Sequence, residues 1–271
     1  MTVDLSVIIP VFHAQETLPR ALASIEVPAG LTVEIIVSVD DGDDYGVVAR
    51  DWPGVRVIDE GRQVRTGPGP ARNRGFAAAK GQFIAYLDAD DAWSPGYIAA
   101  LFPIAQVEGC AFAPTVIEAH DGTEILRVPG QGQDRLMLSD FARWGASFHT
   151  MHAAGLPRGT ADGPFWNAPA QDVMHAVEVF MACGLTAALV PEVSYRLRLG
   201  GSTVTTAADF SDSLTAAYAA YDEALADTWA QTLFAGKSAL NDRYQSERIT
   251  GESFYAFVAR INADEASACT H

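Results

Sequence analysis

The sequence predicts an α/β protein in which helices flank a mostly parallel β-sheet and a helical extension follows at the C-terminus. Over the first hundred residues, short runs of branched apolar residues alternate with helix-like segments, the pattern of a parallel sheet wrapped by helices. The first two runs are almost continuous in valine and isoleucine, which predicts strands that are buried on both faces. From about residue 209 onward, alanine and aromatic residues recur at helical spacing and predict two or three amphipathic helices.

The elements of the first half alternate along the chain. Strands are predicted at residues 5–11, 33–39, 55–58 and 82–87. Helices are predicted at residues 16–25, 45–51, 71–79 and 95–107, the last with Ser94 as its N-cap and Pro95 at its first position. Ligands bind at the carboxyl ends of the strands in such sheets, so the loops after these strands are the expected site.

The pattern changes near Cys110, after which strands are predicted around residues 112–117 and 124–128. The next stretch is rich in Gly, Pro, His and Trp and is expected to shape a ligand site, before a helix at 173–182 and a strand at 187–190. His149 and His152 stand three apart, which on a helix would put both on one side. Because further ligands at zinc-site spacing are not evident, we expect them to line an acceptor pocket or to pack in the core.

The composition limits the partners of the chain. Its 271 residues, 49% of them hydrophobic, are enough for one sizeable domain or for one domain plus a small extension. The 18 basic and 34 acidic residues give a net charge of −16, and Lys80 and Lys237 are the only lysines. A role on nucleic acid or on anionic lipid is therefore disfavoured, since both need a basic face.

The cysteines and the apolar runs indicate the cellular compartment in which the protein is expected. Cys110, Cys183 and Cys269 are an odd number and lack CxxC or metal-ligand spacing, which fits a reducing cytosol. The N-terminus lacks a basic leader, and the longest mostly apolar stretch is too short to span a bilayer. We therefore expect a soluble cytoplasmic protein without a transmembrane segment. Peripheral contact with the inner face of a membrane stays open, because amphipathic segments dock without spanning.

An acidic loop ends the fourth predicted strand, where Asp88-Ala89-Asp90-Asp91 follows the apolar run of residues 83–87. Carboxylates this close repel one another unless a cation or a donor-rich ligand neutralises them. Oxygen ligands of this kind suit Mg²⁺ or Mn²⁺, which complete their shells with water and substrate phosphates. The alternative is a polar turn that caps the next helix.

The ends of three predicted strands should meet at one edge of the sheet. They carry Pro10-Val11-Phe12-His13, Asp40-Asp41-Gly42-Asp43-Asp44 and Asp88-Ala89-Asp90-Asp91. Residues 61–70 add a glycine-rich loop with Arg62 and Arg65 that leads into the helix with Arg72, Asn73 and Arg74. A cationic loop at a helix N-terminus is a place for phosphate oxygens, whereas the alternative is a solvated loop with ordinary arginines.

Several motifs, in order and spacing, resemble the GT-A domain of family 2 glycosyltransferases. They are Val7-Ile8-Ile9-Pro10-Val11-Phe12, Glu34-Ile35-Ile36-Val37 running into Asp40-Asp41-Gly42, Ala71-Arg72-Asn73-Arg74-Gly75 and the segment 83–91. The similarity is strong over about residues 4–102 and resumes more weakly at Gln171-Asp172 and at residues 195–202. It implies a Rossmann-like GT-A domain over residues 1–205, with a nucleotide-sugar half at 1–108 and an acceptor half at 109–205. The helical extension would then occupy residues 206–271.

The resemblance also implies a reaction. A family member transfers a sugar from a nucleotide-diphosphate donor, most commonly a uridine diphosphate sugar, to an acceptor hydroxyl with inversion at the anomeric carbon. Mn²⁺ or Mg²⁺ would stabilise the leaving diphosphate. The acceptor would be a glycan, a glycolipid or a glycoprotein. The C-terminal helices would serve a homodimer, docking of an acceptor protein or membrane contact, and their acidity makes contact with anionic lipid the least favoured of these.

Residue by residue, the acidic loop matches the DxD motif of the family. Asp90 is the implied metal ligand, and Asp88 would reach the ribose or a water bound to the metal. Asp91 is a weaker metal candidate.

The other implied nucleotide contacts come from the first two strands, the third helix and a late strand. Pro10 and Val11 would touch the nucleotide through their backbone, Asp41 would accept hydrogen bonds from the base, and Asp40 would sit beside it. Arg72 would contact the base or the diphosphate, and Arg198 would pair with the diphosphate. The alternatives are an Asx-stabilised turn before Gly42 and a surface arginine at Arg198. His13 stands where the family commonly has asparagine.

The implied base is Asp172, which matches the second acid of the Glu-Asp pair of the family. An inverting displacement needs such a base within hydrogen-bond reach of the acceptor hydroxyl. Gln171 replaces the usual glutamate, so any role of that first carboxylate is lost. The alternative for Asp172 is an N-cap of the helix that follows.

Two other functions compete with this one. A sugar-1-phosphate nucleotidyltransferase would carry a glycine-rich loop after the first strand, whereas residues 10–15 contain no glycine. A degenerate member would bind a sugar nucleotide or a partner protein without turnover. Gln171 and His13 support that alternative, and the intact Asp88-Ala89-Asp90 opposes it.

Overall fold

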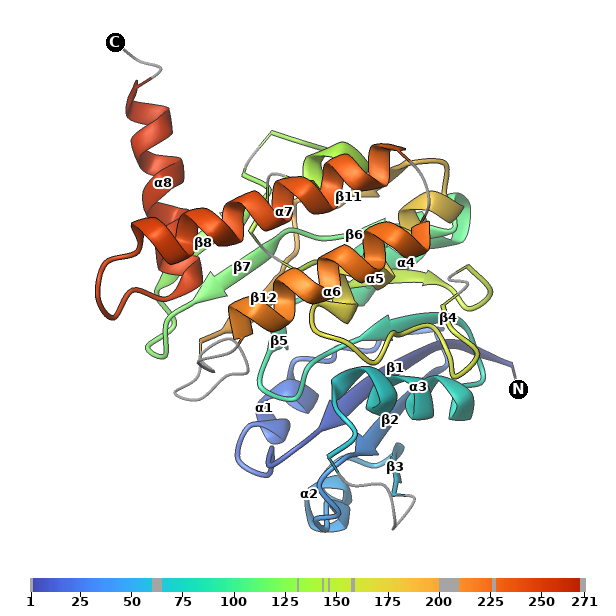
Figure 1. Cartoon of the computed structure of the whole chain (residues 1–271). Helices are drawn as coiled ribbons and strands as arrows, with labels where there is room; N and C mark the ends of the chain where they lie inside the picture. Colours follow the sequence, from blue (N-terminus) through green and yellow to red (C-terminus); the bar gives the residue numbers. More distant parts are fainter. Residues whose placement is uncertain are drawn as a thin grey trace.

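A computed structural model describes residues 2–59, 65–130, 132–142, 144–145, 147–156, 159–199, 210–225 and 228–268 (Figure 1). Eight strands form the larger sheet, in the spatial order β3-β2-β1-β4-β10-β6-β11-β9. Their bounds are β1 Val3–Val11, β2 Val33–Val39, β3 Val55–Ile58, β4 Gly81–Tyr86, β6 Cys110–Phe112, β9 Arg135–Met137, β10 Thr150–Ala153 and β11 Thr186–Leu189. Strands β3, β2, β1 and β4 pair in parallel, whereas β10 is antiparallel to both of its neighbours.

A smaller sheet of four strands packs beside the larger one. Its order is β5-β12-β7-β8, with β5 at Ala92–Trp93, β7 at Thr115–Glu118, β8 at Glu124–Val128 and β12 at Tyr195–Arg198. The predicted single strand over residues 112–117 is wrong in this respect. Pro114 lies between β6 and β7, and the chain passes there from the larger sheet to the smaller one.

Eight α-helices and one 3-10 helix are described in addition to the two sheets. They are α1 Leu18–Ala23, α2 Gly46–Arg50, α3 Pro68–Ala78, α4 Tyr97–Glu108, the 3-10 helix η1 Leu138–Ala142, α5 Gln171–Ala182, α6 Phe210–Leu225, α7 Thr228–Glu247 and α8 Phe254–Ala268. Figure 1 shows α6 and α7 side by side over the half of the molecule that contains β6 and β11. None of the helices in the described residues is long and apolar enough to cross a membrane.

Two apolar clusters hold these layers together. One joins β1, β2 and β4 to α1 and α4, and the other joins β6, β11 and α5 to α6 and α7. Helices α6 and α7 contribute Leu214, Ala217, Tyr218, Tyr221, Leu233 and Phe234 to the second cluster. These two helices therefore share the core of α5, whereas Phe257, Val258 and Ile261 of α8 form a cluster of their own.

Several predicted element ends move in the structure. The helix predicted at 95–107 begins at Tyr97 after Gly96, whose φ of 76° only glycine adopts easily, so Ser94 is not its N-cap. The helix predicted at 71–79 begins earlier, at Pro68, because Asp40 accepts the backbone N–H groups of Thr66 and Gly67. Residues 60–64 with Arg62, residues 200–209 with Ser202, and Cys269 lie outside the described residues.

Close approach of α3 to the sheet fixes where its side chains point. Gly75 lies on the face of α3 that meets β1, and a Cβ atom there would collide with Ile8. The helix therefore lies close enough to the sheet for its polar residues to reach the loops at the strand ends.

Candidate active site

The carboxylate of Asp91 is used inside the protein. It is 3% exposed, and its two oxygens accept hydrogen bonds from Tyr195 Oη at 2.8 Å and from the Arg198 backbone N–H at 2.9 Å. Tyr195 Oη in turn accepts the backbone N–H of Asp88 at 3.0 Å. Burial, followed by the charges of Asp90 and Asp88, raises the pKa of Asp91 well above its ordinary value. Asp91 thus ties the acidic loop to β12, which makes it the least accessible of the three for a metal.

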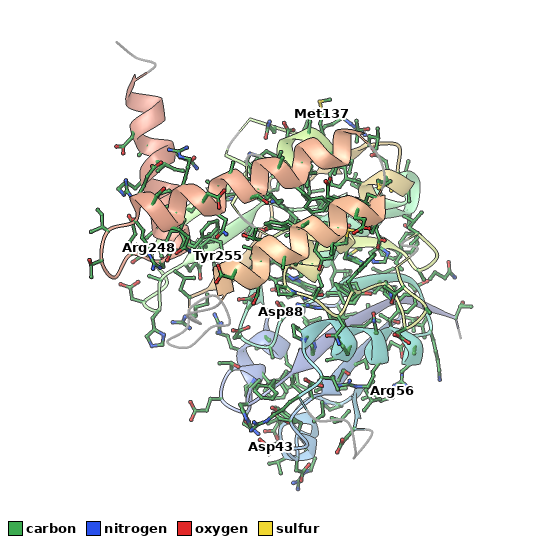
Figure 2. All side chains as sticks on the ribbon, viewed as in Figure 1. Asp43, Arg56, Asp88, Met137, Arg248 and Tyr255 are labelled. Atoms are coloured by element: carbon green, nitrogen blue, oxygen red, sulfur yellow. The ribbon has the colours of Figure 1, made fainter. Side chains whose placement is uncertain are left out.

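Asp88, labelled in Figure 2, is held by two basic side chains, Arg72 and His149. Arg72 Nη2 donates a hydrogen bond to Asp88 Oδ1, and His149 Nε2 lies 3.6 Å from Asp88 Oδ2. Burial alone would raise the pKa of Asp88, but Arg72 and His149 hold it below its ordinary value. The carboxylate is therefore ionised and fixed in orientation before any ligand arrives.

Asp90 is the open member of the loop. Its residue is exposed, and its backbone carbonyl accepts a hydrogen bond from Arg20 Nη2 of α1. Desolvation by the walls of the site and the nearby carboxylate of Asp88 raise the pKa of Asp90. A cation bound between an exposed carboxylate and a second one beside it would neutralise the repulsion between them.

Two arginines lie beside this loop. Arg198 donates through Nη2 to the backbone carbonyl of His120, and its Nε is buried without a hydrogen-bond partner among the described residues. Burial and the charge of Arg198 lower the pKa of Arg20. Arg198 was predicted from the sequence, whereas Arg20 was not, because an arginine in a short helix carries no distinguishing pattern.

Three consecutive residues of α3 bind three different loops. Arg72 contacts Asp88, and Asn73 bonds both backbone groups of Phe165, each at 2.8 Å. Arg74 donates to Asp40 Oδ1 at 2.8 Å. Arg72, predicted to contact the base or the diphosphate, has Nη2 on Asp88, and its Nε and Nη1 are buried without a hydrogen-bond partner among the described residues. Its guanidinium carbon lies 5.2 Å from the centroid of the Phe165 ring.

Asp40 organises the entrance to α3. Its carboxylate accepts hydrogen bonds from Thr66, from the Gly67 N–H at 2.9 Å and from Arg74 at 2.8 Å, and the residue is 3% exposed. The backbone N–H of Asp40 donates to the carbonyl of Val11 at 2.9 Å. Asp40 therefore shapes the nucleotide edge of the sheet, and its oxygens are already occupied.

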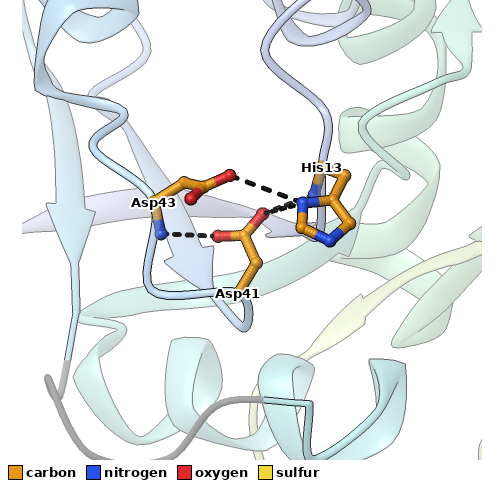
Figure 3. Close-up of side chains that lie close together, drawn as sticks. All are labelled: His13, Asp41 and Asp43. Atoms are coloured by element: carbon orange, nitrogen blue, oxygen red, sulfur yellow. Dashed lines mark hydrogen bonds and ion pairs between the residues drawn. The ribbon is translucent and has the colours of Figure 1, made fainter.

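Asp41 is likewise engaged within the protein (Figure 3). Its carboxylate accepts the backbone N–H groups of His13 and Asp43 and the hydroxyl of Tyr45 at 2.7 Å. Burial opposes ionisation, yet these donors lower the pKa of Asp41 below its ordinary value. The Asx turn considered from the sequence is thus present, and it positions the loop after β2.

His13, Asp41 and Asp43 bring three potential ligand atoms within 4.8 Å of one another. His13 Nδ1 lies 3.4 Å from Asp43 Oδ2 and 3.6 Å from Asp41 Oδ2. Because the oxygens of Asp41 already accept three hydrogen bonds, this group is a hydrogen-bonded turn more than a vacant metal site. It lies apart from the acidic loop that was predicted to hold the metal.

The edge beside Pro10 and Val11 also carries an exposed ring. Phe12 is 47% exposed, and the guanidinium carbon of Arg65 lies 6.0 Å from its ring centroid. The ring of His13 lies 4.3 Å from that of Phe12. An exposed aromatic face next to an arginine is a surface on which a nucleobase can stack. In the sequence, Phe12 is marked only by its place after the first strand.

Asp172 lies in the first turn of α5. The N-cap of α5 is Ala170, so Asp172 does not cap the helix. Its charge acts on Arg72 and on groups from all three C-terminal helices, namely Tyr218, Tyr221, Lys237 and Tyr255. Gln171 is 6% exposed and its Oε1 has no partner within the described residues.

The two histidines do not lie on a helix, so their spacing of three does not place them on one side. His149 just precedes β10, is stacked on Tyr195 with ring centroids 4.2 Å apart, and faces Asp88. His152 lies within β10 beside His175, with ring centroids 5.0 Å apart. Burial lowers the pKa of His152 to about 4, and its Nδ1 contacts the carbonyl of Ala153 at 2.9 Å. His152 is thus a neutral core residue and His149 a site residue.

Comparison with known proteins decides the family. The model of glycosyl transferase family 2 matches residues 6–163, which is more than half of the chain and contains the acidic loop. The chain belongs to this glycosyl transferase family.

Two curated relatives are named as a succinoglycan biosynthesis protein and as a glucosyltransferase. The chain is 30% identical over 143 residues to the succinoglycan biosynthesis protein ExoO of Rhizobium meliloti, which covers 52% of this chain and 39% of that protein. It is 32% identical over 138 residues to the GalNAc(5)-diNAcBac-PP-undecaprenol beta-1,3-glucosyltransferase of Campylobacter jejuni, which covers 48% of this chain and 44% of that protein. The chain spans about two fifths of the length of these relatives.

Solved structures share the fold. TarS residues 1–349 of S. aureus, in complex with UDP-GlcNAc, superposes with a TM-score of 0.65 at 17% identity, covering 92% of this chain and 74% of that one. The fold class predicted for this glycosyl transferase family member, a GT-A-like sheet flanked by helices, is confirmed.

Proposed function

We propose that the protein transfers a sugar from a nucleotide-diphosphate donor to an acceptor hydroxyl, with inversion at the anomeric carbon. The observation that carries the proposal is the position of Arg72. Its guanidinium group bonds Asp88 of the acidic loop and interacts with the charge of Asp172 on α5. The charges of the proposed donor side and of the proposed base therefore both act on one buried arginine.

The nucleotide is proposed to lie along the ends of β1 and β2. Phe12 and Arg65 offer a stacking surface, while Pro10 and Val11 supply backbone at the same edge. Asp40 and Asp41 hold the walls of this edge, and Asp41 is proposed to accept a base N–H at Oδ1, to which the Asp43 N–H also donates. A uridine diphosphate sugar is the proposed donor, supported by the solved complex of TarS with UDP-GlcNAc.

The residues of the acidic loop fit a hard divalent cation. Asp90 is exposed with a raised pKa, and Asp88 is ionised next to it, so a cation would meet oxygen ligands with unbalanced negative charge. Asp90 and Asp88 would hold Mn²⁺ or Mg²⁺. Asp91 is the weaker ligand candidate, because its oxygens accept hydrogen bonds from Tyr195 and from the Arg198 backbone. When bound, the cation would neutralise charge on the diphosphate leaving group.

The transfer step is a single displacement. The acceptor oxygen attacks the anomeric carbon from the face opposite the phosphate, the new C–O bond forms, and the bond to the phosphate oxygen breaks. Asp172 takes the acceptor proton, and the nucleoside diphosphate leaves with the bonding electron pair. Arg198, and Arg20 beside it, are proposed to stabilise the negative charge that develops on the diphosphate.

The proposal also covers the class of acceptor, the cellular location and the oligomeric state. A glycan, glycolipid or glycoprotein acceptor would enter between residues 109–205 and the helical extension of residues 206–271, with 1–108 as the donor half. The undecaprenol-linked acceptor in the name of the Campylobacter jejuni relative supports a lipid-linked glycan. A cytoplasmic location with peripheral membrane contact, and a homodimer through the C-terminal helices, complete the proposal.

Calorimetric titration tests the donor site. Nucleoside diphosphates and nucleotide sugars are titrated with and without Mn²⁺, and we expect one nucleotide to bind in a metal-dependent manner. Matched Mg²⁺ and Ca²⁺ titrations identify the preferred cation. If the folded protein binds none of the nucleotides under any condition, the proposed function is wrong.

A degenerate binding protein is the second candidate. Gln171, buried where the family commonly has glutamate, favours it because one carboxylate is missing next to the proposed base. Donor hydrolysis separates the two candidates, since a transferase releases nucleoside diphosphate from the donor and a binding protein does not. The loop over residues 10–15, which lacks glycine, leaves a nucleotidyltransferase as the least supported alternative.

A further inference from the structure

The guanidinium group of Arg72 has one polar and one aromatic contact. Arg72 is 3% exposed, and its Nη2 donates to Asp88 Oδ1, the one hydrogen-bond acceptor that this side chain has among the described residues. Its guanidinium carbon lies over the Phe165 ring, 5.2 Å from the centroid. A guanidinium group at this distance is attracted by the negative face of the ring, and the attraction is stronger where water is excluded. Because one hydrogen bond leaves the plane of the group free to rotate, the ring supplies the second contact that can fix it.

The Phe165 ring is itself held by other aromatic side chains. It is stacked on His175 of α5, with ring centroids 4.2 Å apart and an interplanar angle of 7°. Tyr86 of β4 meets Phe165 edge to face, with centroids 4.7 Å apart. All three rings are at most 2% exposed. Burial lowers the pKa of His175 well below its ordinary value, so the imidazole is neutral and adds no positive charge that would repel Arg72.

The backbone of Phe165 is fixed to the helix that carries Arg72. Asn73 Nδ2 donates to the Phe165 carbonyl, and Asn73 Oδ1 accepts the Phe165 N–H, each at 2.8 Å. Four residues before Asn73, a Cβ atom at Gly69 would collide with the carbonyl oxygen of Trp166. The guanidinium group and the ring beside it therefore belong to one close contact between α3 and the segment that precedes α5.

We propose that Phe165 is a positioning residue for Arg72, whose guanidinium group the ring face holds in the orientation that directs Nη2 at Asp88. This inference deepens the proposed function and rests on it, because Asp88 belongs to the proposed site for the donor and its cation. Phe165 acts through Arg72 and not on the substrate. Arg72, once oriented, keeps the carboxylate of Asp88 ionised and fixed before the donor binds.

Graded fluorination of the Phe165 ring tests the contact at nearly constant shape. Fluorine withdraws electron density from the ring face, so 4-fluoro- and then 3,4,5-trifluorophenylalanine at position 165 should attract a cation progressively less. We expect the Kd for nucleotide in the presence of Mn²⁺ to rise in that order, by about tenfold for the trifluorinated ring.

The matched control is the same series at Phe141, a ring that is 1% exposed and packs on Phe148 and Phe180. Fluorination there should leave the Kd within about twofold, because the ring packs on other rings. A constant Kd along the series at position 165, or an equal rise at position 141, would overturn the proposal.

A double-mutant cycle tests whether Phe165 acts through Arg72. Phe165→Leu keeps an apolar side chain but removes the ring face, and it should raise the Kd for nucleotide with Mn²⁺ by about tenfold. In an Arg72→Met background the same substitution should change the Kd by less than about twofold, because no guanidinium group is left to position. A purely structural role would give the same factor in both backgrounds, and that result would contradict the proposal.

Thermal unfolding without ligand separates this proposal from the proposed function. The losses in Tm from Phe165→Leu and Arg72→Met should be less than additive in the double variant, because both remove the same contact, whereas those from Phe141→Leu and Arg72→Met should add. Additive losses at Phe165 and Arg72 would reject the proposal. If the wild type binds no nucleotide while these losses stay non-additive, the proposed function is wrong and the positioning of Arg72 by Phe165 is still supported.

Discussion

The two acidic loops at the edge of the large sheet differ in what their carboxylates do. In the loop after β2, Asp40 and Asp41 accept hydrogen bonds from neighbouring backbone and side-chain donors. In the loop after β4, Asp88 is held by Arg72 and Asp90 remains exposed. A carboxylate whose hydrogen-bond donors belong to the protein fixes the shape of its loop. A carboxylate whose charge is not balanced within the protein is available to bind a cation.

The largest effect is expected at the base. Asp172→Asn should keep donor and metal affinity but reduce transfer by about 10³-fold, because the amide cannot take the acceptor proton. Single-turnover transfer and calorimetry on the same preparation measure the two properties. Glu178→Gln, on the same helix, is the matched control. Transfer at the wild-type rate in Asp172→Asn would reject this assignment of the base.

The second prediction separates the two acidic loops as metal sites. Asp90→Ala should weaken metal-dependent nucleotide binding by about 100-fold, since it removes a ligand carboxylate. Asp43→Ala, in the His13-Asp41-Asp43 group, should leave that binding within about twofold because its loop lies apart from the metal. Titration of nucleotide with and without Mn²⁺ measures both variants. The reverse ranking would move the metal to the loop after β2.

The third prediction concerns stability. Asp40→Ala should cost about 3 kcal/mol in the free energy of unfolding, because Arg74 and the N–H groups of Thr66 and Gly67 lose their buried partner. Asp90→Ala should change it by less than about 0.5 kcal/mol, since its carboxylate is exposed. Denaturant unfolding compares the two variants directly. Equal losses of unfolding free energy in the two variants would contradict the view that Asp40 is structural and Asp90 is not.

A smaller loss is expected where the second loop is tied to β12. Tyr195→Phe should cost about 1 to 2 kcal/mol, because it removes the hydroxyl that donates to Asp91 and accepts the N–H of Asp88. Donor affinity should fall as well, since the loop loses its tether. Thermal unfolding and nucleotide titration check both effects, with Tyr244→Phe as a distant control. A variant with unchanged stability and affinity would show that the tether is dispensable.

The smallest effect concerns acid stability. The pKa of Asp41 is lowered by its hydrogen bonds, so its stabilising contribution is present above about pH 4 and is lost as the pH falls through the lowered value. Asp41→Asn should therefore lose stability near neutral pH and show a shallower decline below pH 4. Urea unfolding at a series of pH values tests this sign. A steeper acid decline in the variant would contradict it.

Much of the fold was predictable because the apolar pattern is strong where the sheet is parallel. Strands β1, β2 and β3 are valine- and isoleucine-rich, and their predicted and observed positions agree within two residues. Strand β10 was not predicted, because Thr150–Ala153 is short and lies in a stretch without periodicity. The break at Pro114 was missed because the apolar residues continue across it.

The site was only partly predictable, since sequence motifs mark residues but not their partners. The acidic loop and Arg72 were found from their pattern, yet the contact between Arg72 and Asp88 depends on the close approach of α3 to β1. Arg20 comes from α1 and His149 from the segment just before β10, and neither position shows its partner in the local sequence. Only the packing brings them to the acidic loop.

The turn of α3 that contains Arg72, Asn73 and Arg74 limits how this enzyme can be redesigned. Its three side chains anchor the loops after β4 and β2 and the segment at Phe165. A loop exchanged to alter donor preference must therefore keep its anchor atom in place, or the other two loops will shift with it. Variation is better directed at residues such as Phe12, which lies at the same edge but carries none of these anchors.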